Sequence, residues 1–86
     1  MFKTCKVSPI EDYTHSFEHP TLFKGEEYEV SIETELIIKN GKLEDWACVT
    51  IWDEDEAEEW EEKSITFEGE ASAVMAMVNL LFTFKD

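Results

Sequence analysis

Hydrophobic and polar residues alternate most regularly along residues 27–39, EYEVSIETELIIK. In an extended strand, successive side chains point to opposite faces. Tyr28, Val30, Ile32, Leu36 and Ile38 then share one face, and Glu29, Glu33 and Glu35 lie on the other. The pattern predicts a half-buried strand whose outer face carries a row of carboxylates, with alternate positions about 6.6 to 6.8 Å apart.

The pair Asn40-Gly41 follows directly, and Asn-Gly is a favoured sequence for the type I′ turn of a β-hairpin. Residues 43–52 should therefore return as an antiparallel strand, and both faces of that strand are apolar. Two further strands are expected at residues 2–7, FKTCKV, and at residues 64–67, SITF. Together these segments predict a small, mainly antiparallel sheet of three to four strands.

Two helices are expected beside this sheet. Ser8-Pro9-Ile10-Glu11 has the form of a capping box with proline at the first helical position, which predicts a short N-terminal helix over residues 9–18. Residues 70–84 contain no glycine or proline and predict an apolar C-terminal helix packed on one face of the sheet. Its broadest apolar stripe consists of Ala71, Val74, Met75, Val78, Leu81 and Phe82. The fold class expected is α+β, as a single domain over residues 1–86.

The net charge of the chain narrows the classes of function that are expected. The chain has 21 Asp and Glu against 7 Lys and Arg, a formal net charge of −14, and such self-repulsion contributes nothing favourable to folding. It disfavours direct binding to nucleic acid and adsorption to an anionic membrane. The N-terminal residues lack the apolar core of a signal peptide, so a cytoplasmic protein is expected.

Residues 53–62, DEDEAEEWEE, hold eight carboxylates in ten positions, and a short helix and an acidic loop both fit them. They do not fit a calcium-binding EF-hand, because Ala57 and Glu58 stand where that loop needs an oxygen ligand and a glycine. His15 and His19 are one helical turn apart but lack an obvious third ligand. We expect no metal site and no cofactor.

Signatures of catalysis are also missing from the sequence. It has three glycines and contains no glycine-rich phosphate loop, nucleophile elbow or zinc motif. Cys5 and Cys48 lack the spacing of a redox or zinc motif and are expected to be core residues. The chain is therefore predicted to bind a partner and not to be an enzyme.

The distribution of negative charge suggests what that partner is. A broad anionic surface can replace the phosphates of DNA or RNA in the basic site of a nucleic-acid-binding protein. The sequence thus predicts a nucleic-acid mimic that inhibits a nuclease, restriction or CRISPR-type defence complex, the strategy of anti-restriction and anti-CRISPR proteins of phages and mobile elements. The partner-binding residues expected are Glu29, Glu33, Glu35, Glu44, Asp45, Asp53, Glu54, Asp55, Glu56, Glu58, Glu59, Glu61 and Glu62, with Trp52 and Trp60 as aromatic anchors.

Two other interpretations remain open at this point. The chain is alternatively an acidic adaptor or regulatory subunit that binds a protein through an apolar surface, such as Trp46, Trp52 and Trp60 or the spare face of the last helix. That helix also leaves a homodimer open. The plainest interpretation is that strand glutamates and an acidic loop only keep the protein soluble.

Overall fold

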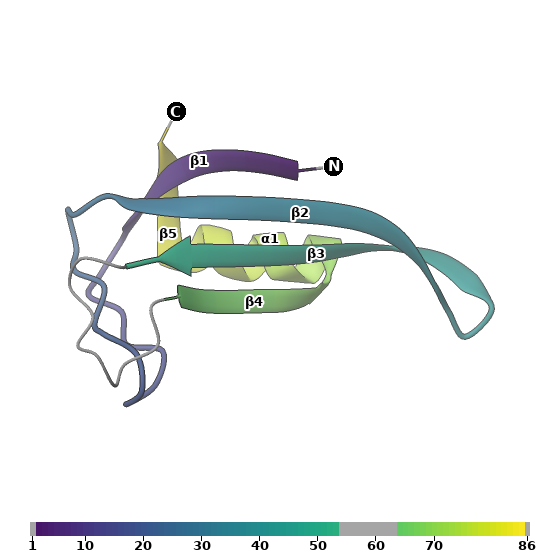
Figure 1. Ribbon diagram of the computed structural model, residues 1–86, viewed down its shortest axis with the longest axis horizontal. Helices are drawn as coiled ribbons and strands as arrows, with labels where there is room; N and C mark the ends of the chain where they lie inside the picture. The colour runs from purple at the N-terminus through teal and green to yellow at the C-terminus, as the bar shows by residue number, and fades with distance from the viewer. Residues whose placement is uncertain (1, 54–63, 86) are drawn as a thin grey trace.

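The computed structural model describes residues 2–53 and 64–85. In this part of the chain, five strands form one antiparallel sheet in the order β4-β3-β2-β1-β5, which curls into a half-barrel around a short helix (Figure 1). In chain order the elements are β1 (Phe2–Pro9), β2 (Tyr28–Lys39), β3 (Lys42–Trp52), β4 (Ser64–Glu70), α1 (Ala71–Leu81) and β5 (Phe82–Lys85).

The predicted α+β class is wrong, because the N-terminal helix does not form and the fold is mostly β. Ser8 and Pro9 belong to β1, where they pair with Thr83 and Phe82 of β5, so Ser8 is buried and does not cap a helix. An isolated helix of about ten residues is marginal in water, and the segment is rich in aromatic, histidine and short polar residues that favour helices weakly. Pairing with β5 supplies β-ladder partners for residues 8 and 9 and buries Ser8, which a short helix without packing partners would not do.

Residues 10–27 instead form a long loop that folds back on itself. Tyr13 and Leu22 exchange two backbone hydrogen bonds of 2.8 Å, which close the loop like a short ladder. Leu22 is fully buried, and the ring of Tyr13 meets the ring of Phe82 edge-on at 5.5 Å between centroids. Apolar packing at these two residues fixes the loop against the body of the domain.

The C-terminal helix is shorter than predicted, because it ends at Leu81 and the chain continues as a fifth strand. In β5, Phe82 is buried and Thr83 is exposed, the alternation of a half-buried strand. Within α1 the predicted apolar stripe does face the sheet, with Val74 and Val78 buried against β3, β4 and β5. The carboxylate of Glu70 caps the helix by accepting hydrogen bonds from the backbone N–H groups of residues 72 and 73.

The predicted hairpin is confirmed. Asn40 and Gly41 both have positive φ, 52° and 76°, as a type I′ turn requires. The register that follows pairs Val30 with Ile51 and Ile32 with Val49 on the helix side of the sheet. Val30, Val49 and Ile51 form the core together with Val7, Leu22, Tyr28, Ala47, Ile65, Phe67, Val74, Val78 and Phe82, and Ile32 packs against it.

Both cysteines are free thiols. Cys5 packs against the core as predicted, whereas Cys48 is half-buried and lies on the opposite side of the sheet, between Glu33 and Glu68. Within the described ranges, no helix combines the length and the apolar character that crossing a membrane would need.

Candidate protein-binding face

The strands β1 to β4 expose one broad surface, which we call the outer face: the side of the sheet that faces away from α1 (Figure 1). The register brings residues far apart in the sequence into rows across it. Glu33 of β2 lies beside Cys48 of β3, which lies beside Glu68 of β4. In the next row the same strands place Glu35, Trp46 and Glu70 side by side.

Four carboxylates on these two rows form what we call the glutamate patch, Glu33, Glu35, Glu68 and Glu70. Alternate residues along a strand are about 6.8 Å apart, and β2 and β4 are two strand spacings, about 9.6 Å, apart. The four side chains therefore lie near the corners of a rectangle. Rigid pleated backbone, not a flexible loop, sets these spacings.

Trp46 lies within the glutamate patch, on the row between Glu35 and Glu70. Its indole Nε1 donates a hydrogen bond of 3.2 Å to Glu68 Oε1, and the ammonium of Lys39 lies 5.5 Å from the centroid of its ring. A cation at that distance over an indole is attracted by the negative face of the ring. Trp46 is thus engaged within the protein at both its polar edge and its face.

Glu70 is held in its charged form. Hydrogen bonds from the Ser72 hydroxyl, and then from the backbone N–H groups of Ala73 and Ser72, lower the pKa of its carboxyl group. The same contacts make Glu70 the cap of α1, so its carboxylate is fixed in position. At neutral pH this corner of the glutamate patch carries a full negative charge.

Glu68 and Glu70 were not among the residues that the sequence predicted for the site. The predicted strand ended at Phe67, but the alternation continues through SITFEGE, with Ile65 and Phe67 buried and Thr66 and Glu68 exposed. Extending that period by three residues would have placed both glutamates on the outer face.

The other predicted partner-binding residues do not all lie on the outer face. Glu29 lies on the outer face beside Trp52, which is 41% exposed, and Glu44 lies there beside Ile37. Asp45, in contrast, is opposite Leu36 on the helix side. Asp53 is only 7% exposed, so its carboxylate is not a surface group. The remaining predicted residues lie outside the described part of the chain: Glu54, Asp55, Glu56, Glu58, Glu59, Trp60, Glu61 and Glu62.

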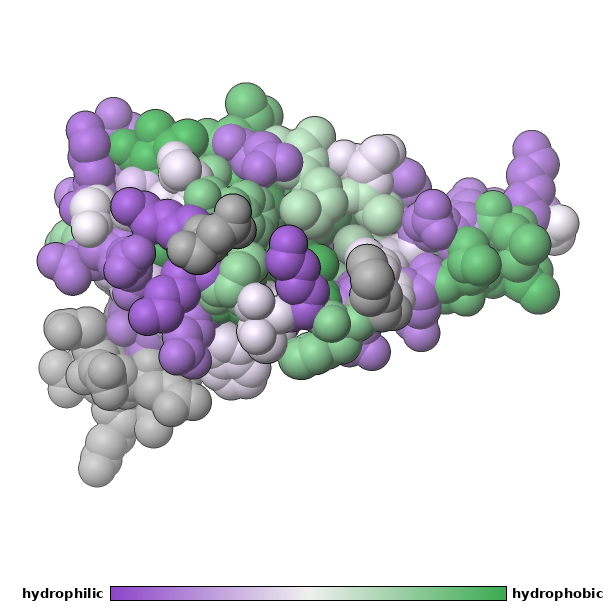
Figure 2. Space-filling model, turned by 90° about the horizontal axis from the view of Figure 1, so that it is seen from above, coloured by the Kyte–Doolittle hydropathy of each residue, from purple (hydrophilic) through white to green (hydrophobic). Residues whose placement is uncertain are grey.

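A second surface feature is an apolar hairpin arm, residues 36–45, which extends past the ends of the neighbouring strands (Figure 1). Leu36, Ile38 and Leu43 are on its helix side and are 67%, 77% and 70% exposed. Figure 2 shows a hydrophobic patch at the projecting end of the molecule, where the hairpin arm lies. The alternation along residues 27–39 predicts that Leu36 and Ile38 are buried, but it does not show where the neighbouring strands end.

The two histidines lie close together in the loop. Their ring centroids are 5.0 Å apart, with His15 Nδ1 3.0 Å from the Tyr13 hydroxyl and His19 Nδ1 2.6 Å from the Ser16 hydroxyl. Burial, and then the proximity of His19, lower the pKa of His15 and favour its neutral form. Over residues 2–53 and 64–85, no three His, Cys, Asp or Glu side chains are grouped so as to hold a metal ion.

Among residues 2–53 and 64–85, ion pairing offsets little of the negative charge. Within the described residues the one salt bridge joins Lys24 to Glu11 at 3.8 Å, and both side chains are largely exposed. Raising sodium chloride from about 10 mM to about 150 mM shortens the screening length from roughly 30 Å to roughly 8 Å. We expect this to raise the melting temperature of the domain by a few degrees, measured by circular dichroism. A constant or lower melting temperature would show that repulsion among the carboxylates does not limit stability.

No family model, curated protein or solved structure matches the chain. The geometry and charge of the outer face and the hairpin arm are therefore the grounds for a function.

Proposed function

We propose that the protein is a small acidic inhibitor that mimics nucleic acid and occupies the basic nucleic-acid site of a nuclease, restriction or CRISPR-type defence complex. The glutamate patch is the observation that carries this proposal. Along each strand its carboxylates are about 6.8 Å apart, which equals the rise of two nucleotides in one strand of duplex DNA. Lysine and arginine side chains of the partner that are placed to contact phosphates would therefore meet carboxylates whose spacing matches two nucleotide steps.

Rigid strands suit this role for an energetic reason. A partner that binds a flexible acidic tail must order that tail, and the lost conformational entropy reduces the affinity. The glutamate patch is already ordered, because β2, β3 and β4 fix its backbone and Glu68 and Glu70 are hydrogen-bonded within the protein. The net charge of −14 adds long-range attraction, which raises the rate of association with a basic partner.

Competition with nucleic acid tests the proposal. The immobilised protein is used to capture basic proteins from a host lysate, and the bound fraction is then exposed to duplex DNA or RNA at constant ionic strength. We expect nucleic acid to displace the partner. We also expect the affinity of the purified partner to fall steeply with salt, because charged contacts dominate it. Retention of the partner at saturating nucleic acid would reject the mimic.

An acidic adaptor is the second candidate, and the hairpin arm favours it. Three large apolar side chains, Leu36, Ile38 and Leu43, are more than half exposed on one face of the arm. An isolated two-stranded hairpin is marginally stable in water, so a partner that covers this face would stabilise it. In the competition experiment an adaptor keeps its partner in the presence of nucleic acid and loses it on the substitution Ile38→Thr.

A further inference from the structure

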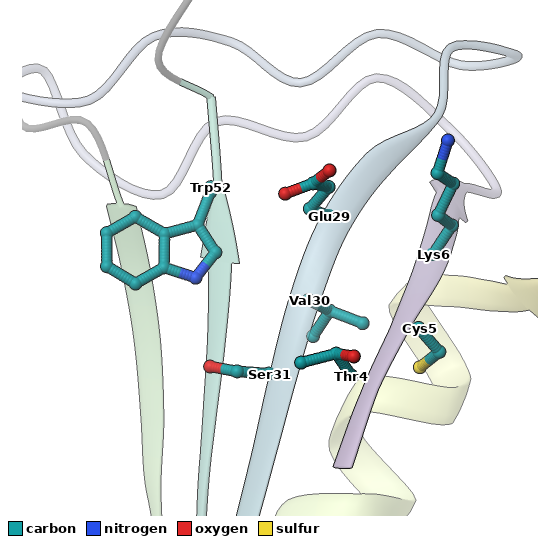
Figure 3. Close-up of a pocket in the computed structure, with 7 residues that line it drawn as sticks. All are labelled: Thr4, Cys5, Lys6, Glu29, Val30, Ser31 and Trp52. Carbon is teal, nitrogen blue, oxygen red and sulfur yellow. The ribbon is translucent and has the colours of Figure 1, made fainter.

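The outer face contains a hollow of about 310 Å³ that crosses three strands (Figure 3). It lies next to the glutamate patch, toward the other end of the sheet. It is lined by Thr4, Cys5, Lys6, Glu29, Val30, Ser31 and Trp52. Its volume is near the lower end of the range for ligand pockets, roughly 300 to 1,000 Å³, so it suits one long side chain and not a large ligand.

One wall of the hollow is the ring of Trp52. Trp46, which is on the same strand and the same face, has Lys39 over its ring and Glu68 at its indole nitrogen. The side chain of Trp52 is 41% exposed and has no hydrogen bond, ring contact or cation over its ring among the described residues. The protein thus engages one of these two tryptophans internally and presents the other to solvent.

The opposite wall is polar and carries a negative charge beside that ring. Glu29 is paired with Trp52 in the sheet register, and its carboxylate turns toward the tryptophan (Figure 3). Lys6 is paired with Glu29 on the other side, but its ammonium points away from Trp52 and it makes no salt bridge within the described residues. The hydroxyls of Thr4 and Ser31 lie further along the same strands and offer hydrogen-bond acceptors.

We propose that this hollow binds an arginine side chain of the basic partner; this inference rests on the proposed function, because it names one contact of the mimic with that partner. A guanidinium stacks flat on an indole ring while its edge donates hydrogen bonds to a carboxylate. Trp52 supplies the ring, Glu29 the carboxylate, and Thr4 and Ser31 accept from the remaining N–H groups. A lysine ammonium has no flat face and only three donors, so the hollow prefers arginine.

Three blocked peptides test the preference on the full chain: acetyl-Gly-Arg-Gly-amide, the same peptide with lysine, and the same peptide with citrulline. Citrulline keeps the shape of arginine but is neutral. The indole N–H signal of Trp52, followed by two-dimensional ¹H–¹⁵N NMR, reports occupancy of the hollow, and the signal of Trp46 is the internal reference. We expect a saturable shift of Trp52 with arginine, a dissociation constant roughly two- to fivefold weaker with lysine, and no saturable shift with citrulline.

Substitutions locate the site. Glu29→Gln should abolish the preference for arginine over citrulline, and Glu27→Gln, an exposed position outside the hollow with the same charge change, should keep it. Because Trp52→Phe and Trp52→Ala both remove the reporter, these two variants are tested by following the amide signals of Ser31 and Thr4. Trp52→Phe should bind arginine more weakly than the parent, and Trp52→Ala should bind it more weakly still, because the attraction of the ring decreases in that order.

The outcomes separate this inference from the proposed function. Equal binding of the arginine and lysine peptides, or unchanged binding by Glu29→Gln and Trp52→Ala, overturns the arginine site even if nucleic acid displaces the natural partner. If the arginine peptide binds as expected but nucleic acid does not displace the partner, the site stands and the mimic is rejected.

Discussion

Replacing Glu29, Glu33 and Glu35 together by lysine should leave the domain folded and abolish tight binding to a basic nucleic-acid-binding partner. All three side chains are exposed on the outer face and none is in the core, so the core is unchanged. Lysines at these positions would face the partner's own cations, and such like-charge contacts cost several kcal/mol. We expect the dissociation constant to rise at least about a hundredfold at low salt.

The matched control changes the same amount of charge elsewhere. Lysine at Glu18, Glu26 and Glu27 alters the net charge equally, and these three exposed residues lie in the loop outside the strands. Folding is checked by circular dichroism, and binding by competition against the partner's DNA or RNA over a salt series. If both triple variants lose affinity equally, total charge and not the outer face drives binding. If the outer-face variant still competes like the parent, mimicry by these residues is rejected.

The part of this surface that the sequence predicted depends on a strictly local rule. In a strand, the residue two positions away is always on the same face, so Glu29, Glu33 and Glu35 could be grouped without knowing any partner strand. The turn at Asn40-Gly41 was equally local, since it depends on residues that tolerate positive φ. The structure confirms both the shared face of these glutamates and the turn.

Other features of the site depend on contacts between distant segments, which a single sequence does not reveal. Glu68 and Glu70 join the glutamate patch only because β4 pairs with β3 in one particular register. Leu36 and Ile38 share the apolar period of β2, yet they are exposed, because β1 pairs no further than Glu33. Periodicity gives the face of a residue, whereas the lengths of the neighbouring strands decide whether that face is covered.

The failed helix prediction has the same origin. Ser8-Pro9-Ile10-Glu11 meets the local requirements of a capping box, but pairing of β1 with β5 takes Ser8 and Pro9 into the sheet. Residues Phe82–Lys85, which form β5, are more than seventy positions along the chain from Ser8 and Pro9. The helix prediction and the structure disagree about which side chains of the N-terminal segment are buried, and this difference is measurable.

Leu22→Ala should therefore be one of the most destabilising single substitutions in the chain. Leu22 is fully buried, and its backbone pairs with Tyr13 to close the loop of residues 10–27. Truncating a buried leucine costs about 2 to 5 kcal/mol, through lost burial and the cavity left behind. For a domain of this size, which has little stability in excess, we expect urea unfolding to show a large drop in midpoint or a chain that is partly unfolded in buffer.

Phe17→Ala is the matched control, and it separates the structure from the predicted helix. Phe17 shares the apolar face of a helix over residues 9–18 with Ile10 and Tyr13, so that helix would bury its ring. In the structure the side chain is 83% exposed, and removing it should change the free energy of unfolding by no more than about 0.5 kcal/mol. A larger loss for Phe17→Ala than for Leu22→Ala would mean that the N-terminal segment packs as a helix, because only then does residue 17 contribute to the core.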